Sequence, residues 1–176
     1  MTNFSDWTDI LLIIAPILIS VGGMYLLIKN LFDRDYRLKL IDSKRMLQKE
    51  MLPLRLQAME RMSLFLERIS PESLVLRVMQ PGMQSRDLHI ELLTNIRSEY
   101  EHNASQQVYV APQTWLLIKK AKDEVVKLIN VASQQTSTET KAVELSRRIM
   151  ELEAGYETSP VQIALDALKI EAQQFY

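Results

Sequence analysis

The chain has 176 residues, of which 47% are hydrophobic, and its 21 basic and 22 acidic residues give a net charge of −1. Because the two signs are interspersed, the chain lacks an electrostatic footprint for nucleic acid, and the absence of cysteine excludes disulfides and thiol chemistry. Few glycines and many Leu, Met, Ala, Glu, Lys and Gln residues favour helices over sheets. We therefore expect an all-α protein with one N-terminal transmembrane helix and a cytosolic bundle of about five to six helices.

The longest apolar stretch lies near the N-terminus. Residues Ile10 to Ile28 carry no charge, and Leu31 and Phe32 extend the apolar surface. About 20 apolar residues suffice for a helix to cross a bilayer. A secretory signal would begin with basic residues, whereas residues 1–9 contain two aspartates and no Lys or Arg. The pattern predicts a retained transmembrane helix over residues 10–32, with a long buried core helix as the alternative.

Basic residues follow this stretch and do not precede it. Since Lys and Arg near a span favour the cytoplasmic side, residues 1–9 are expected outside and the remaining chain inside. The juxtamembrane basic residues of this prediction are Lys29, Arg34, Arg37 and Lys39.

Three small or helix-bending residues share one face of the predicted span. Pro16, Ser20 and Gly23 have the spacing i, i+4, i+7, and small residues allow close approach of helices in lipid. This face is a candidate contact for self-association. The alternative is that Pro and Gly are merely tolerated in membrane helices.

Residues 33–52 read as a juxtamembrane helix or stalk, too short and too interrupted to assert a coiled coil. Pro53 predicts a kink or a fresh helix start, so the cytosolic helical domain is assigned to residues 53–176. Its first helix, residues 54–69, has an apolar stripe on one face. Further along, Ser85 and either Ser137 or Thr138 are expected to cap helices, and Ser159 to Gln162 form a capping-box pattern. The later elements expected are helices over 71–79, 86–102, 112–132, 139–153 and 160–176, with loops over 103–111, whose apolar residues dock on the core, and 133–140.

Few residues offer catalytic or metal chemistry. Glu99 and His102 have the Glu-x-x-His spacing of di-iron bundles, but such a site needs the motif twice, and His89 has Arg86 three residues before it. No phosphate loop or nucleophile motif occurs. We expect no cofactor, metal or small-molecule substrate. Two patterns allow two interpretations each. The lysines of the helix expected over residues 112–132 either touch anionic lipid or form a solvated face. The methionines either form an adaptable binding groove or fill the core. These residues are Lys119, Lys120, Lys122 and Lys127, and Met51, Met59 and Met62.

The run PLRLQAMERMSLFLERISPESLVLRVMQPGM, then IRSEYEHNASQQVYV, and a motif from Trp115 to Asn130 resemble an uncharacterised family of small membrane-anchored helical proteins of Bacteroidota. The resemblance covers roughly Leu52 to Asn130. It implies a bacterial inner-membrane setting and supplies no known activity. Its polar positions and one turn indicate a candidate interaction surface, which comprises Pro81, Gly82, Glu101, His102, Asn103, Gln106 and Gln107.

These observations favour a single-pass membrane protein whose helical domain binds another protein, or a second copy, as a scaffold or accessory subunit. One alternative is a membrane-tethered enzyme or metal protein that uses the Glu99/His102 region. Another is a domain that senses anionic lipid through its lysine-bearing helix.

Overall fold

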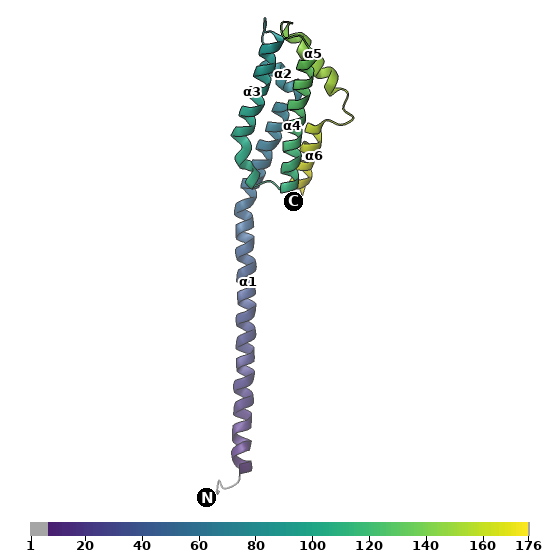
Figure 1. Cartoon of the computed structure of the whole chain (residues 1–176). Helices are drawn as coiled ribbons and strands as arrows, with labels where there is room; N and C mark the ends of the chain where they lie inside the picture. Colours follow the sequence, from purple (N-terminus) through teal and green to yellow (C-terminus); the bar gives the residue numbers. More distant parts are fainter. Residues whose placement is uncertain (1–6, 176) are drawn as a thin grey trace. The chain divides into compact units, whose positions relative to one another are not determined.

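The structure, a computed structural model, describes residues 7–175, and within that range it is helical and contains no strand (Figure 1). The all-α prediction is confirmed. The chain divides into two units, Met1–Glu50 and Met51–Tyr176, which are described separately. The helices are α1 (Trp7–Ile69), α2 (Pro71–Val78), α3 (Ser85–Asn103), the 3-10 helix η1 (Ala104–Val108), α4 (Pro112–Gln134), α5 (Ala142–Glu153) and α6 (Pro160–Gln173).

The first unit consists of the N-terminal part of α1. Its segment Ile14–Arg34, 21 residues long, is long and apolar enough to cross a membrane, and none of it is buried. The Ser20 hydroxyl donates a hydrogen bond to the Pro16 carbonyl at 2.7 Å. This bond gives the Ser20 hydroxyl a hydrogen-bond acceptor within its own helix. The predicted outer segment 1–9 falls largely on residues 1–6, which lie outside the described residues, as does the side chain of Arg37.

Pro53 does not start a new helix. α1 continues through it to Ile69, so the predicted fresh start is wrong. Proline removes one backbone donor from a helix interior, which costs about 3 kcal/mol when nothing compensates. The packing of the next four turns compensates here, because Met59, Met62 and Phe65 are almost fully buried.

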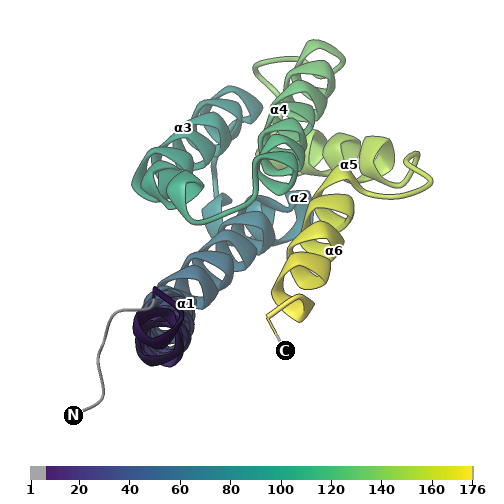
Figure 2. The same cartoon turned by 90° about the horizontal axis from the view of Figure 1, so that it is seen from below.

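The second unit has one hydrophobic core. α4 lies between α3 and α6 in two perpendicular views (Figures 1 and 2), and the last turns of α1 contribute the largest buried side chains. Phe65 lies 6.0 Å from Tyr100, and Tyr100 stacks on Trp115 at 6.1 Å between ring centroids. Tilted and offset aromatic pairs contribute stability in addition to that which comes from the apolar area they bury. Met59 and Met62 are thus core residues, whereas Met51 is exposed.

Predicted caps differ from the observed helix starts. The Ser85 hydroxyl bonds Thr140 and the Lys141 carbonyl instead of capping α3, whose N-cap is Gln84. α5 begins at Ala142 and not at residue 139, because residues 137–140 form a turn that pairs with the chain before α3. Ser159 is the N-cap of α6, but its side chain makes no capping bond, and the Gln162 amide donates to Asp166 instead.

The segment 104–111 only partly follows its prediction. Its first half is the 3-10 helix η1, and Val110 is buried in the core with Tyr109 packed beside it. Val108, however, is 78% exposed. The expectation that all apolar residues of this segment dock on the core is therefore wrong for Val108.

A buried carboxylate ties three segments at one end of the bundle, which we call the Arg55 end. Glu171 Oε1 accepts hydrogen bonds from the Ala111 backbone N–H at 2.9 Å and from Arg55 Nη2 at 3.4 Å. Arg55 Nε donates to the Tyr109 carbonyl, and its guanidinium lies 4.5 Å from the Phe175 ring centroid. These contacts connect α1, the segment before α4, and α6.

Replacing Glu171 by Ala is expected to lower the free energy of unfolding by about 2 kcal/mol, because it leaves the half-buried Ala111 N–H and the Arg55 guanidinium without their acceptor. Chemical denaturation of the full chain in detergent, followed by Trp fluorescence, measures this. A matched control is Glu144→Ala, which removes an exposed ion pair with Arg147 and should cost at most about 0.5 kcal/mol. Equal losses in the two variants would contradict a structural role for Glu171.

Candidate functional site

A hollow lies at the end of the bundle opposite Arg55, which we call the Gly82 end. It has a volume of about 580 Å³ and lies between the loop 79–84 and the segment 139–143, whose last two residues begin α5. Gly82 has a φ of +83°, in the left-handed region that favours glycine, and so allows the tight turn after Pro81. The Pro-Gly turn singled out in the sequence therefore forms one wall of the hollow.

Hydrogen bonds hold the two walls together. The Ala142 N–H donates to the Met83 carbonyl at 3.0 Å, and the Ser85 N–H donates to the Thr140 carbonyl at 2.8 Å. Ser85 is buried, and its hydroxyl bonds Thr140 Oγ1 and the Lys141 carbonyl. Because the loops are joined by both backbone and side-chain bonds, the hollow is preformed.

The lining of the hollow combines apolar, charged and backbone groups. It offers the exposed apolar side chain of Val143, one carboxylate from Glu139 and one ammonium from Lys141, together with the backbone of the turn. Pockets that combine apolar surface with a few polar groups are the usual form of a recognition site. No nucleophile–base pair lines it.

The rest of the predicted interaction surface lies at the Arg55 end. Glu101, His102 and Gln107 are exposed around the end of α3 and η1, and Gln106 is half-buried. Asn103 is buried, and its amide donates to the Glu99 carbonyl at 2.9 Å. These residues form the last turn of α3 or follow it, whereas the Pro81–Gly82 turn precedes it. α3 has 19 residues and so measures about 28 Å. The structure thus separates the predicted surface into two parts.

Glu99 is engaged by two arginines. Its Oε1 lies 2.9 Å from Arg68 Nη1 and 3.6 Å from Arg77 Nη1. Two guanidinium groups at one carboxylate disfavour a divalent cation at the same oxygen. No group of three potential metal ligands occurs in the described part of the chain. The other histidine, His89, bonds the Asn130 side chain through Nε2 at 2.8 Å.

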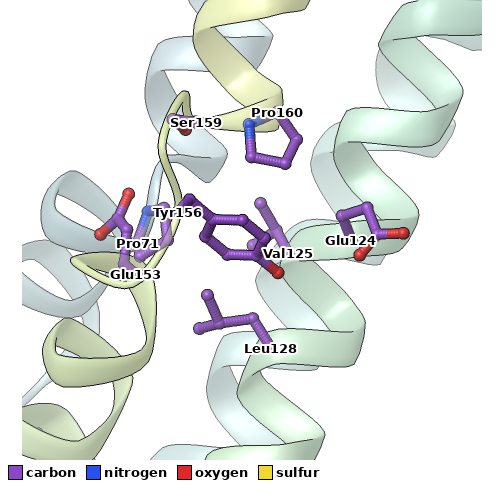
Figure 3. A pocket seen from close by; sticks show the side chains of 8 residues that line it. All are labelled: Pro71, Glu124, Val125, Leu128, Glu153, Tyr156, Ser159 and Pro160. Atoms are coloured by element: carbon purple, nitrogen blue, oxygen red, sulfur yellow. The ribbon is translucent and has the colours of Figure 1, made fainter.

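A smaller pocket beside α4 is closed by its own side chains. Its volume is about 10 Å³, at most the room that one water needs. Figure 3 shows the Tyr156 ring over Leu128 and Val125, with Pro160 beside it and the Glu153 carboxylate next to Pro71. Burial, and secondarily repulsion from Glu72, raises the pKa of Glu153 above its ordinary value of 4.5.

The predicted juxtamembrane and helix-borne cations are placed as follows. Lys29, Arg34 and Lys39 are exposed on α1. On α4, Lys122 pairs with Asp123 and also lies over the Tyr100 ring, and Lys127 pairs with Glu124. Lys119 and Lys120 are exposed.

Comparison with protein families identifies the chain over almost its whole length. A model of a family of unknown function (DUF7935) matches residues 5–175. The chain belongs to the DUF7935 family. No curated protein and no solved structure matches it. The DUF7935 match extends well beyond the stretch Leu52–Asn130 on which the sequence resemblance was based, and it covers both α1 and the bundle.

The sequence analysis missed the second wall of the hollow. Residues 139–141 were assigned to a loop and a helix start, and nothing in them indicated pairing with the chain before α3. In this DUF7935 chain, Ser137 and Thr138 are residue types that favour helix starts, and the one-residue bridge between Gln84 and Lys141 has no sequence pattern of its own.

Glu153→Gln is expected to stabilise the fold at neutral pH. Because the folded state raises the pKa of Glu153, the folded chain binds its proton more tightly than the unfolded chain, and stability falls as pH rises from about 4.5 through the raised pKa. The glutamine variant lacks this loss. Thermal unfolding across pH measures the difference, which should shrink at acidic pH. Glu157→Gln, at an exposed position, is the control; a Glu153→Gln effect independent of pH would contradict the assignment.

Proposed function

We propose that this protein is a single-pass inner-membrane protein whose cytosolic helical domain is non-catalytic and binds another protein as a scaffold or accessory subunit. The bacterial setting, in Bacteroidota, is part of the proposal. One observation supports it above the others: a single helix, α1, links an unburied apolar segment to a bundle with a preformed hollow.

The membrane part of the proposal is supported by exposure. The large apolar side chains from Ile14 to Phe32 are 42–74% exposed, on every side of the helix. A helix that is apolar all round is stable only when something covers it, and a bilayer covers all faces at once. A core helix of a soluble protein would be covered by its own chain. The N-outside orientation is supported by the basic residues on the C-terminal side alone.

The recognition part of the proposal is supported by the hollow at the Gly82 end. Its rim is fixed by hydrogen bonds, so a ligand would not bear the entropy of ordering the loops. Its volume of about 580 Å³ accommodates several side chains of a partner segment. The partner class is a protein segment that combines apolar and charged side chains, matching Val143, Glu139 and Lys141.

Orientation can be tested cleanly because the chain has no cysteine. Single variants Ser5→Cys and Ser137→Cys, expressed at full length in bacterial cells, are treated with a membrane-impermeant maleimide. We expect labelling of the first in intact cells and of the second only after permeabilisation. The opposite pattern would reverse the orientation, and labelling of both in intact cells would contradict an inner-membrane anchor.

The recognition site can be tested by site-specific cross-linking in cells. A photoreactive residue at Val143, on the rim of the hollow, is expected to give a discrete adduct of fixed mass with a protein partner. The matched control is a photoreactive residue at Arg97, exposed on α3 and away from the hollow. The same adducts from both positions, or none from Val143, would contradict a binding role for the hollow. An adduct of twice the chain mass would identify a second copy as the occupant.

A further inference from the structure

A groove lies between α4 and the start of α6, and its volume is about 290 Å³. One wall is a single face of α4, because its residues follow the spacing i, i+3, i+4, i+7. The other wall comes from the loop after α5 and from the first turn of α6. The lining consists of Leu117, Lys120, Ala121 and Glu124 on α4, Tyr156 in the loop, and Pro160 and Ile163 on α6. These residues border one cavity, which we call the α4–α6 groove.

The walls of the α4–α6 groove are mainly apolar. Ala121 is buried in α4, and its small side chain leaves room that a larger one would fill. The Tyr156 ring lies over Val125 and Leu128 (Figure 3), and the pocket on that side has a volume of only about 10 Å³. Ile163 is 45% exposed and borders the open side. The groove is therefore a shallow apolar site, at the small end of the range for ligand pockets.

Lys120 supplies the free charge of the groove. It is exposed, and no carboxylate among the described side chains forms an ion pair with it. Glu124, the other charged residue of the lining, is engaged elsewhere, since its Oε2 lies 3.5 Å from Lys127 Nζ. Within the described part of the chain, the Tyr156 hydroxyl also makes no hydrogen bond. Two hydrogen-bond donors, one of them a cation, thus border an apolar cavity.

We propose that the α4–α6 groove binds a small molecule that has an apolar body and one carboxylate. The apolar body would displace water from Pro160 and Ile163, and the carboxylate would accept hydrogen bonds from the Lys120 ammonium and the Tyr156 hydroxyl. Apolar walls with a few polar groups are the usual form of a small-ligand site. The inference goes beyond the proposed function and concerns the second unit alone, so it depends neither on the membrane anchor nor on the hollow at the Gly82 end.

The sign of the ligand's charge follows from the pairing in the groove. An apolar cation would have to compete with Lys127 for Glu124, whereas an apolar anion meets Lys120 without displacing any described partner. A single free ammonium also balances a single negative charge. Both considerations favour a monocarboxylate over an amine or a doubly charged phosphate.

Methyl NMR of the full chain tests the inference. The chain is labelled at isoleucine methyl groups and reconstituted in nanodiscs of zwitterionic lipid. The probes are phenylacetate, phenethylamine and phenethyl alcohol, which share an aromatic body and differ in charge. We expect phenylacetate alone to shift the Ile163 signal in a saturable manner. The signal of Ile170, an exposed isoleucine of the same helix that does not line the groove, should stay in place.

Two neighbouring lysines give a matched pair of variants. Lys120→Gln is expected to raise the Kd for phenylacetate about fivefold, the contribution of a favourable exposed ion pair. Lys119→Gln removes the adjacent exposed ammonium, which does not line the groove, and should leave the Kd unchanged. The signals of the fully buried Ile118 and Ile149 report whether each variant keeps its fold.

Other outcomes would overturn the inference. The absence of a saturable shift with millimolar phenylacetate excludes the site, and equal shifts of Ile163 and Ile170 show unspecific adsorption. Tighter binding of phenethylamine makes Glu124 the selecting charge and contradicts the carboxylate assignment, as does equal binding of all the probes. If both lysine variants weaken binding equally, the general charge of the surface attracts the probe and the groove does not.

Discussion

The fold depends on a change of pattern within one helix. α1 is apolar on all sides from Ile14 to Phe32 and apolar on one side from Met59 to Ile69. The first pattern leaves no face that water can solvate favourably, and the second offers a stripe for α2 to α6 to cover. The bundle needs that stripe, since Met62, Phe65, Leu66 and Ile69 are among its largest fully buried side chains. Without the last turns of α1, the remaining helices would have no common centre.

A consequence is that the part of α1 after Pro53 belongs to the bundle. The buried stripe starts only a few residues later, and Arg55 bonds both Tyr109 and Glu171. A rotation of α1 at this point would break the bonds of Arg55 to the segment before α4 and to the end of α6. The two ends of the bundle differ in this respect: the Arg55 end is held by a buried carboxylate, and the Gly82 end by backbone bonds between loops.

Periodicity predicted most of the fold, because burial in a helical bundle follows the 3.6-residue repeat directly. The apolar stripe predicted over residues 54–69 agrees with the burial of Met62, Leu66 and Ile69. The predictions of helix-capping side chains were less accurate. Ser85 and Ser159 have the residue types that cap helices, but a hydroxyl binds whichever acceptor tertiary packing brings closest, and for Ser85 that is Thr140 and Lys141. Pro53 failed as a helix boundary for the same reason, since packing outweighed a local preference.

The candidate sites were predictable only in part, and the reason is geometric. The Pro81–Gly82 turn was visible in the sequence because glycine after proline favours a tight turn, but its partner wall at 139–143 lies more than fifty residues away and is joined by a single bridge. The exposure of Val108, at the Arg55 end, could not be predicted from the neighbouring residues. Val108 belongs to a Val-Tyr-Val run that reads as core-forming, and in the structure Arg55 donates to the Tyr109 carbonyl between the two valines. Since Val110 takes the core position and the peptide at Tyr109 is held by Arg55, Val108 is left at the surface. Arg55, which pairs with the buried Glu171, thus holds the peptide next to the exposed Val108.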